Sequence, residues 1–433
     1  MLLCKMSNSQ LCNMRDELLQ QLDAYKKMSL SLNMTRGKPC KEQLDLTTEL
    51  FKNVDIYTDS TDEYGVDCRN YGELYGIRGL RKLLAPLVCA TEERVIAGGS
   101  SSLNMMFDVM MKLVVFGADD KNPPWGTGKQ VKFLCPSPGY DRHFAITELL
   151  GFDLIKVDMT DNGPDMDQVE DLVRDDPSVK GMWFMPVYSN PTGSICSDDN
   201  LRRIAWMKTA APDFRIFCDN AYPVHFLEKY DKMNVNILDE CKKAGNEDRV
   251  FVFSSTSKIS YPGSGVALMA SSENNIRSYA KMLSKQTIGP NKMIQLLHLR
   301  AFKSFDDILV HMEHQAEILR PKFKAVIEIL EKELGSLGIA EWTNPRGGYF
   351  ISFDTMEGCA KKTVELAKSV GVEFTNAGAT FPYGKDEKDR NIRIAPTLPP
   401  VKDLKMAIEV LCTCVKLASI EKILEGQRVS NAV

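Results

Sequence analysis

A lysine that follows small hydroxyl residues is the first position in this sequence that could do covalent chemistry. Lys258 ends the segment Ser255-Thr256-Ser257-Lys258, directly after the apolar run 250–254. An amine held at the end of a buried strand can attack a carbonyl carbon and form a Schiff base. Because most lysines are solvated surface residues, Lys258 is a candidate only if other reactive groups gather around it.

An aspartate and an asparagine follow two further apolar runs. Asp219 ends one run and precedes Tyr222 by three residues, while Asn190 follows another run and precedes Pro191. A buried carboxylate is costly without a partner, and a protonated ring nitrogen would be one that keeps the ring an electron acceptor. Simpler interpretations stay open: Asp219 as a helix N-cap, and Asn190-Pro191 as a turn.

Three more motifs could bind a charged, planar molecule. The segment 98–102, Gly-Gly-Ser-Ser-Ser, opens a helical pattern, where free backbone N–H groups suit a phosphate. Tyr140 follows another apolar run and could stack on a ring. Arg393, between Ile392 and Ile394, could hold a carboxylate in a bidentate pair. The alternatives are a bare turn, ordinary packing and an internal salt bridge.

The elements that must position these motifs alternate along the chain. From about 75 to 300, short apolar runs alternate with helical periodicity, and several runs are apolar almost throughout. This alternation predicts a mainly parallel sheet that is covered by helices on both faces. Open sheets of this kind bind ligands at the carboxyl ends of their strands, where the motifs fall.

A long helical pattern from about 304 to 334 marks a change in organisation, because strands near 348–353 and 392–395 follow it. We therefore predict an N-terminal arm that forms part of a small domain, a large domain, and the rest of the small domain. Their predicted ranges are 1–45, 46–304 and 305–433.

Composition excludes several classes of function. The chain has 433 residues, 26% of them charged, and a net charge of −4. It therefore has no excess of positive charge that would attract nucleic acid or an anionic membrane. No apolar stretch is long enough to span a bilayer, and the first residues lack an apolar signal core. Twelve scattered cysteines fit reduced thiols. We expect a cytoplasmic protein with no metal site and no membrane or nucleic-acid partner.

Taken together, the motifs resemble the class I aminotransferases of fold type I, the aspartate aminotransferase family. The likeness runs from about Gly37 to the last helix. Its set of motifs is Asn-Pro-Thr-Gly, Asp-x-x-Tyr, Ser-x-Ser-Lys and a late arginine. The phrases NMTRGKP, STSKISYPGSGVA and KQTIGPNK are similar to a divergent bacterial-type subgroup of aspartate aminotransferases. The resemblance implies a seven-stranded, mainly parallel sheet in the large domain, a smaller α/β domain, and pyridoxal 5′-phosphate as cofactor.

The resemblance also implies roles for individual residues. Lys258 would be the Schiff-base lysine and proton shuttle, Asp219 the partner of the pyridine nitrogen, and Tyr222 the partner of the phenolic oxygen. Asn190 would bond that oxygen and the substrate carboxylate, and Tyr140 would stack on the ring. The further residues implied to bind cofactor or substrate are Gly99, Ser100, Ser101, Ser255 and Ser257, Tyr71 from a neighbouring subunit, Arg393 as the α-carboxylate clamp, and Gly37 over the substrate.

The sequence departs from the family pattern at two points. Most of the family has a phosphate-binding arginine about eight residues after the lysine, but the stretch 261–266 carries no cation. Hydroxyls, helix N–H groups, Lys285 or Lys292 would then meet the phosphate charge. The arginine that reads a distal carboxylate also has no clear match, and Arg36 is the first candidate to replace it, with Lys285 second.

The implied function is amino transfer from L-aspartate to 2-oxoglutarate by a ping-pong mechanism, in a homodimer with shared active sites. Other amino acids, aromatic ones among them, are alternative substrates, and a pyridoxal-phosphate carbon–sulfur lyase is an alternative of the same fold. A non-catalytic regulator that binds the cofactor is the alternative from another class. It would need a DNA-binding domain, and only about 35 residues precede Gly37.

Overall fold

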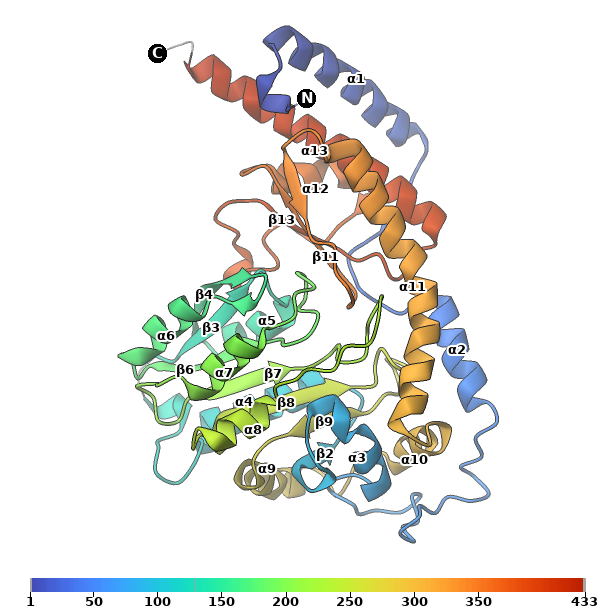
Figure 1. Ribbon diagram of the computed structural model, residues 1–433, viewed down its shortest axis with the longest axis vertical. Helices are drawn as coiled ribbons and strands as arrows, with labels where there is room; N and C mark the ends of the chain where they lie inside the picture. The colour runs from blue at the N-terminus through green and yellow to red at the C-terminus, as the bar shows by residue number, and fades with distance from the viewer. Residues whose placement is uncertain (1, 129, 431–433) are drawn as a thin grey trace.

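The computed structural model describes residues 2–128 and 130–430, and its largest sheet has eight strands in the order β2-β9-β8-β7-β6-β3-β4-β5 (Figure 1). Neighbours from β8 to β4 are parallel, whereas β9 and β5 run antiparallel to the strands beside them. The strands are β2 (Val95–Ala97), β3 (Lys132–Ser137), β4 (Asp153–Thr160), β5 (Gly163–Pro164), β6 (Val179–Phe184), β7 (Arg215–Asp219), β8 (Val250–Ser255) and β9 (Ala267–Ala270).

Alternate side chains of the central strands enter two separate hydrophobic cores, because successive strand residues point to opposite faces. In β8, Val250 and Val252 lie in one core, and Phe251 and Phe253 lie in the other. Helices α4 and α9 complete the core that holds the phenylalanines, while α6, α7 and α8 contribute to the opposite one. These helices are α4 (Ser102–Phe116), α6 (Met166–Arg174), α7 (Asp198–Trp206), α8 (Ile237–Lys243) and α9 (Glu273–Gln286).

A second group of elements lies beyond the large sheet. The strands β10, β11 and β13 form an antiparallel sheet that shares a core with α12 and α13. Helix α11 runs past both groups, and its first turn is fixed by a capping box between Ser304 and Asp307 (Figure 1). The elements are α11 (Phe305–Leu334), β10 (Ala340–Trp342), β11 (Ile351–Thr355), α12 (Ala360–Ser369), β13 (Asn391–Ile394) and α13 (Val401–Ser430).

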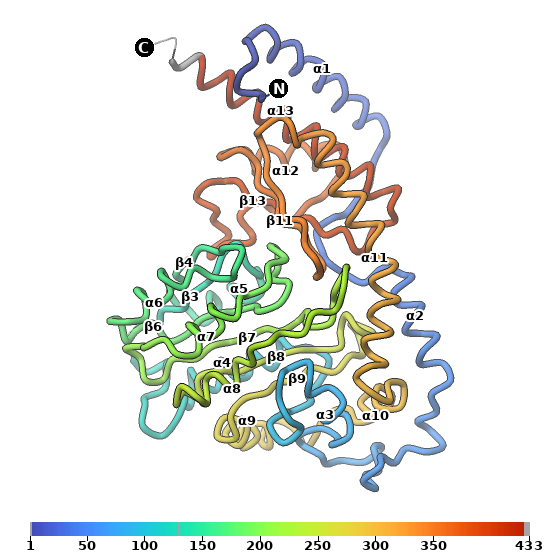
Figure 2. Tube along the Cα trace, viewed as in Figure 1, coloured from blue at the N-terminus to red at the C-terminus, as the bar shows by residue number. Residues whose placement is uncertain are grey.

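The N-terminal arm joins this second group. Helix α1 packs along α13, so the two lie side by side at one end of the molecule (Figure 2). Leu32 in β1 pairs in parallel with Val372 in β12. The remaining elements are α1 (Asn8–Lys27), β1 (Leu32–Asn33), α2 (Lys41–Phe51), α3 (Arg78–Leu84), α5 (Asp141–Leu149), α10 (Lys292–Ala301) and β12 (Val372–Glu373).

The mainly parallel sheet covered by helices is confirmed, but its strand number differs from the prediction. Eight strands are present rather than seven, because Gly163 and Pro164 add a two-residue strand to the edge of β4. So short a strand leaves no periodicity in the sequence. The predicted boundary between residues 304 and 305 coincides with the start of α11. The division into three ranges stays a prediction.

Within the described ranges, no helix has both the length and the apolar character needed to cross a bilayer. The same residues contain no group of three or more histidine, cysteine or acidic side chains that could hold a metal ion.

Candidate active site

A cavity of about 680 Å³ lies where β3, β6, β7 and β8 end, and residues of β13 and of the N-terminal arm close it from the other side. It brings together most of the predicted site residues. Two of them, Gly99 and Tyr71, do not line it. The predicted residues that do are Arg36, Gly37, Ser100, Ser101, Tyr140, Asn190, Asp219, Tyr222, Ser255, Ser257, Lys258 and Arg393.

Lys258 lies in the turn that follows β8, with its amine beside two aromatic rings. The Nζ atom is 5.0 Å from the ring centroid of Tyr222 and 5.9 Å from that of Tyr349. Burial lowers the pKa of Lys258, because removal from water disfavours the charged ammonium, while the negative charge of Asp219 opposes this shift. The amine is therefore easier to deprotonate than that of a solvated lysine, as nucleophilic and general-base chemistry require.

Asp219 ends β7 and has one engaged and one free carboxylate oxygen. Its Oδ2 lies 2.9 Å from Nε2 of His143, whose ring stacks on Trp183 with 4.5 Å between centroids. Its Oδ1 is buried and has no hydrogen-bond partner among the described residues. An orphaned acceptor in a buried carboxylate is costly unless a ligand donates to it. The N–H of a protonated pyridine ring fits this requirement.

The Tyr222 hydroxyl keeps its proton at neutral pH. Burial raises the pKa of Tyr222 well above its usual value, and the charge of Asp219 acts in the same direction. The ring is stacked against Tyr349, at 5.8 Å between centroids, and meets His225 edge-on. Tyr222 can therefore donate a hydrogen bond to an oxygen atom of a bound ring.

The turn before α4 fits a phosphate group. Ser101 is the N-cap residue of α4, and no side chain caps the helix, so its first N–H groups are free of side-chain acceptors. A Cβ atom on Gly99 would meet nothing within 4 Å, so the backbone is open there. Ser257 donates from its Oγ to the Ser100 carbonyl at 3.0 Å, and this bond fixes the turn against the segment that carries Lys258.

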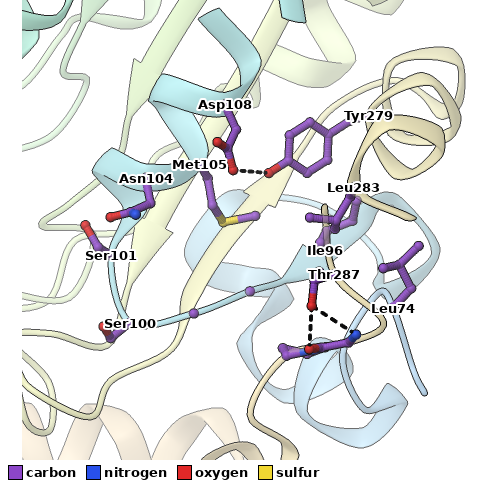
Figure 3. Close-up of a pocket in the computed structure, with 14 residues that line it drawn as sticks. Leu74, Ile96, Ser100, Ser101, Asn104, Met105, Asp108, Tyr279, Leu283 and Thr287 are labelled. Atoms are coloured by element: carbon purple, nitrogen blue, oxygen red, sulfur yellow. Dashed lines mark hydrogen bonds between the residues drawn. The ribbon is translucent and has the colours of Figure 1, made fainter. Parts of the chain in front are cut away.

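A second cavity, of about 420 Å³, adjoins the same turn (Figure 3). Gly99 lines this cavity, and Ser100 and Ser101 line both cavities. In its wall, the Tyr279 hydroxyl donates a hydrogen bond to Oδ2 of Asp108 at 3.4 Å (Figure 3). The turn before α4 is thus bordered by two cavities.

Arg393 on β13 is buried, and among the described residues only one nitrogen of its guanidinium makes a hydrogen bond. Its Nη1 donates to Asp141 at 2.8 Å and to Asn190 at 3.4 Å, and the guanidinium carbon lies 4.9 Å from the ring centroid of Phe350. The Nε atom is buried without a partner in the described part of the chain. A guanidinium oriented in this way has donors left for a carboxylate.

The two lysines considered for the phosphate do not line either cavity. Lys292 is buried and donates to the carbonyls of Asn70 and Gly72, so it holds the loop that carries Tyr71. Lys285 is exposed on α9 and lines neither cavity. Tyr71 itself is 81% exposed and does not line the cavity that holds Lys258.

Sequence reasoning missed several residues of the cavity. His143 carried a usable signal, because it stands three residues after Tyr140 at a helix start and so lies on the same helix face. Tyr349, Phe350 and Asp141 carried none, since only the packing of distant segments brings them to Lys258 and Arg393.

Comparisons with known proteins point to one family. The family model described as aspartate amino-transferase matches residues 6–428. An aspartate aminotransferase of Corynebacterium glutamicum is 44% identical over 414 residues, which is 94% of each chain. A crystal structure of an aspartate transaminase from the same species has a TM-score of 0.94 at 43% identity and covers 98% of this chain and 99% of its own.

A more distant structure supports the fold alone. The α-aminoadipate aminotransferase of Thermus thermophilus, complexed with N-(5′-phosphopyridoxyl)-L-leucine, has a TM-score of 0.73 at 18% identity and covers 97% of this chain and 96% of its own. The family match over nearly the whole chain and the close relatives decide the assignment. The chain belongs to the aspartate aminotransferase family, and it is an aminotransferase of fold type I that uses pyridoxal phosphate.

Proposed function

We propose that the protein transfers the amino group of L-aspartate to 2-oxoglutarate in a ping-pong reaction. The observation that carries this proposal is the arrangement of one cavity. Lys258 with a lowered pKa, the orphaned Oδ1 of Asp219 and the half-engaged guanidinium of Arg393 all face the same space. These are an amine, an acceptor for a ring N–H and a carboxylate clamp, the groups that amino transfer from an α-amino acid would use.

We propose that residues from several segments bind the cofactor. Asp219 would bond the pyridine nitrogen, Tyr222 and Asn190 the phenolic oxygen, and the turn with Ser100 and Ser101 the phosphate. Tyr140 would cover the ring, and Gly99, Ser255 and Ser257 would complete the phosphate site. When bound, pyridoxal phosphate supplies an aldehyde that reacts with amines and a ring that accepts an electron pair.

The remaining steps belong to side chains of this protein. The Nζ atom of Lys258 would hold the cofactor, and once it is free it would take the proton from the α-carbon of the substrate. Arg393 and Asn190 hold the α-carboxylate, with Gly37 above it. Orientation of this kind contributes up to about 7–11 kcal/mol in favourable cases.

We also propose a homodimer in which Tyr71 reaches the phosphate of the partner subunit. Tyr57 and Tyr71 are both 81% exposed on the segment before α3, and Ile288 is 63% exposed beside it. Aromatic and apolar side chains so exposed are typical of an interface. A cytoplasmic location fits the twelve cysteines, which are all free.

Three alternatives keep the same cofactor. An aminotransferase for aromatic or other amino acids, or a carbon–sulfur lyase, would use the same lysine and aspartate but a different side-chain pocket. A non-catalytic regulator would need no group that binds a substrate carboxylate. The donors that Arg393 has left for a carboxylate therefore favour an enzyme over a regulator. Kinetics with a panel of amino acids separates the first two.

The visible spectrum of the purified protein tests cofactor and substrate together. We expect an absorbance band of the bound cofactor that falls when L-aspartate is added and returns when 2-oxoglutarate follows. L-Alanine and L-phenylalanine serve as controls for specificity. If aspartate leaves the band unchanged and another amino acid bleaches it, that other amino acid is the substrate.

Arg36 is the proposed reader of the distal carboxylate of aspartate. It is exposed, lines the cavity, and makes no side-chain hydrogen bond or ion pair among the described residues. We expect Arg36→Ala to lower kcat/KM for aspartate by roughly tenfold, as loss of a hydrogen bond to a charged group does. Steady-state kinetics with aspartate measures this, and unchanged turnover in the variant would exclude the role.

A further inference from the structure

Gln43, in the first turn of helix α2, is an almost fully buried glutamine. It is only 1% exposed, and α2 lies beside α11 (Figure 1). A buried side-chain amide is costly unless its donors and its acceptor have partners. The Oε1 atom of Gln43 accepts a hydrogen bond from the backbone N–H of Cys40 at 3.1 Å, which fixes the start of α2. Its Nε2 atom remains for contacts with other segments.

The Nε2 atom of Gln43 donates in two directions. One hydrogen bond goes to the Tyr349 hydroxyl at 2.9 Å, and the other goes to Oε1 of Gln315 on α11 at 2.8 Å. Gln315 is 2% exposed and extends the network, because its Nε2 donates to the carbonyl of Ile259 at 2.7 Å. Both N–H groups of the Gln43 amide are therefore used, and each leads to a different segment.

Both ends of this network lie at Lys258. Ile259 directly follows Lys258 in the sequence. The ring centroid of Tyr349 lies 5.9 Å from Nζ of Lys258, and this ring stacks against that of Tyr222. The faces of the two rings can attract the amine when it is protonated. Gln43 is thus connected to the backbone that carries Lys258 and to a ring beside its amine.

Helix α2 also contacts the turn after β8 through other side chains. The Thr48 hydroxyl lies 2.6 Å from that of Tyr261, and the Phe51 ring meets Tyr261 edge-on, with 5.5 Å between centroids. His298 on α10 packs edge-on against Phe51, and its Nε2 lies 2.7 Å from Oγ of Ser260. A change in α2 can therefore be passed to the turn after β8.

The two branches of the network differ in how much they depend on Gln43. The Ile259 carbonyl also lies 2.8 Å from Nε2 of His311, so a second side chain is available to hold it. The Tyr349 hydroxyl bonds to Gln43 and makes no second hydrogen bond within the described ranges. Loss of Gln43 would therefore free the Tyr349 ring more than the backbone after Lys258.

We propose that Gln43 is a positioning residue for Lys258, which it serves by fixing the Tyr349 ring beside the amine. The inference rests on the proposed role of Lys258 in holding the cofactor, and not on the choice of L-aspartate as the substrate. An amine that must approach a reacting carbon closely loses rate when its support moves, even if its own chemistry is unchanged. Gln43 does not line the cavity, so substrate binding should depend on it little.

Two variants that remove opposite ends of one hydrogen bond test the proposal. We expect Gln43→Leu and Tyr349→Phe each to lower kcat by about tenfold, the upper range for one hydrogen bond between neutral groups, with KM for L-aspartate within about twofold of normal. The double variant should be no slower than Gln43→Leu alone, because both substitutions remove the same bond. Losses that multiply in the double variant would overturn the proposal, since Gln43 would then act by another route.

Asn275→Leu on α9 is the matched control for the loss of a buried amide. Asn275 is 6% exposed and lies outside the cavity, and its Nδ2 donates to the Asp248 carbonyl at 2.9 Å and to Oγ of Ser271 at 2.8 Å. We expect this variant to lose thermal stability, as Gln43→Leu does, but to keep its kcat. A kcat of Gln43→Leu equal to that of the control would overturn the positioning role.

Circular dichroism of the holoenzyme in the visible range gives a readout that needs no turnover. The signal of a bound chromophore depends on how firmly its surroundings hold it in one orientation. We expect the visible ellipticity per bound cofactor to fall in Gln43→Leu and in Tyr349→Phe, and to stay normal in Asn275→Leu. Normal ellipticity together with normal kcat in Tyr349→Phe would overturn the proposal, even if Gln43→Leu failed to fold.

Failure of the proposed function would look different. If the unmodified protein shows no spectral response to any amino acid, the proposed amino transfer is wrong, but the ellipticity of the bound cofactor still compares the variants. If the unmodified protein responds to aspartate and both Gln43→Leu and Tyr349→Phe match the control, only the positioning role is wrong.

Discussion

Replacing Lys258 by alanine is expected to lower the turnover number by at least about 10³-fold, within the range that a general acid–base group contributes. The expected loss is large because one amine has two tasks. It would bind the cofactor covalently and then carry the substrate's proton. No other lysine lines the inner part of the cavity among the described residues, since Lys38 is exposed at its mouth.

The covalent task can be measured separately from turnover. Borohydride reduction of the holoenzyme, followed by peptide mass spectrometry, should place the cofactor on Lys258 and on no other residue. Lys258→Arg is the matched variant, because it keeps a positive charge but loses the nucleophilic amine. Lys281→Ala, an exposed lysine of α9, is the control for loss of a lysine as such. Turnover within tenfold of normal in Lys258→Ala would remove Lys258 from the mechanism.

The position of Lys258 at a strand end was predictable, and the reason is local. The motifs at Asn190, Asp219 and Lys258 each followed an apolar run, and parallel strands bring their carboxyl ends to one edge of a sheet. The cavity accordingly collects Asn190, Asp219 and Lys258 from segments far apart in sequence. The apolar runs could be recognised because helices cover both faces of the sheet, as the two hydrophobic cores show.

What could not be predicted depends on contacts between distant segments. Asp141 meets Arg393 across 252 positions of the chain, and no sequence pattern of either residue indicates the other. Lys292 was one candidate to meet the phosphate charge, but in the structure it is buried and donates to the carbonyls of Asn70 and Gly72. The short strand β5 and the stacking of Tyr349 on Tyr222 also depend on such contacts, which no sequence pattern indicates.

The second large effect is expected from Asp219. Replacing it by alanine should lower kcat on the order of 10³-fold, comparable to losing a preorganised electrostatic group in other enzymes. The free Oδ1 would hold the proton on the ring nitrogen, and without that proton the ring accepts electrons poorly. Cofactor affinity should change much less than kcat, because the phosphate turn and Lys258 lie on other segments.

Two further variants separate the charge of Asp219 from its packing. Asp219→Asn keeps the shape and the contact with His143 but removes the negative charge, so it should lose nearly as much turnover as Asp219→Ala. His143→Asn removes the group that lies 2.9 Å from Oδ2 and should have a smaller effect on kcat, because the carboxylate remains. Absorbance titration measures the cofactor affinity of each variant, which is then compared with its kcat.

The pattern across these variants decides between a structural and an electronic role. If Asp219 only filled space, Asp219→Asn would be nearly as active as the unmodified protein, since its volume is the same. If Asp219 acts through its charge, kcat falls in both Asp219 variants while KM for aspartate changes little, because aspartate is held by other groups. Substantial turnover in Asp219→Ala would mean that another group keeps the ring protonated. His143, which lies within 2.9 Å of that carboxylate, would then be the first residue to test.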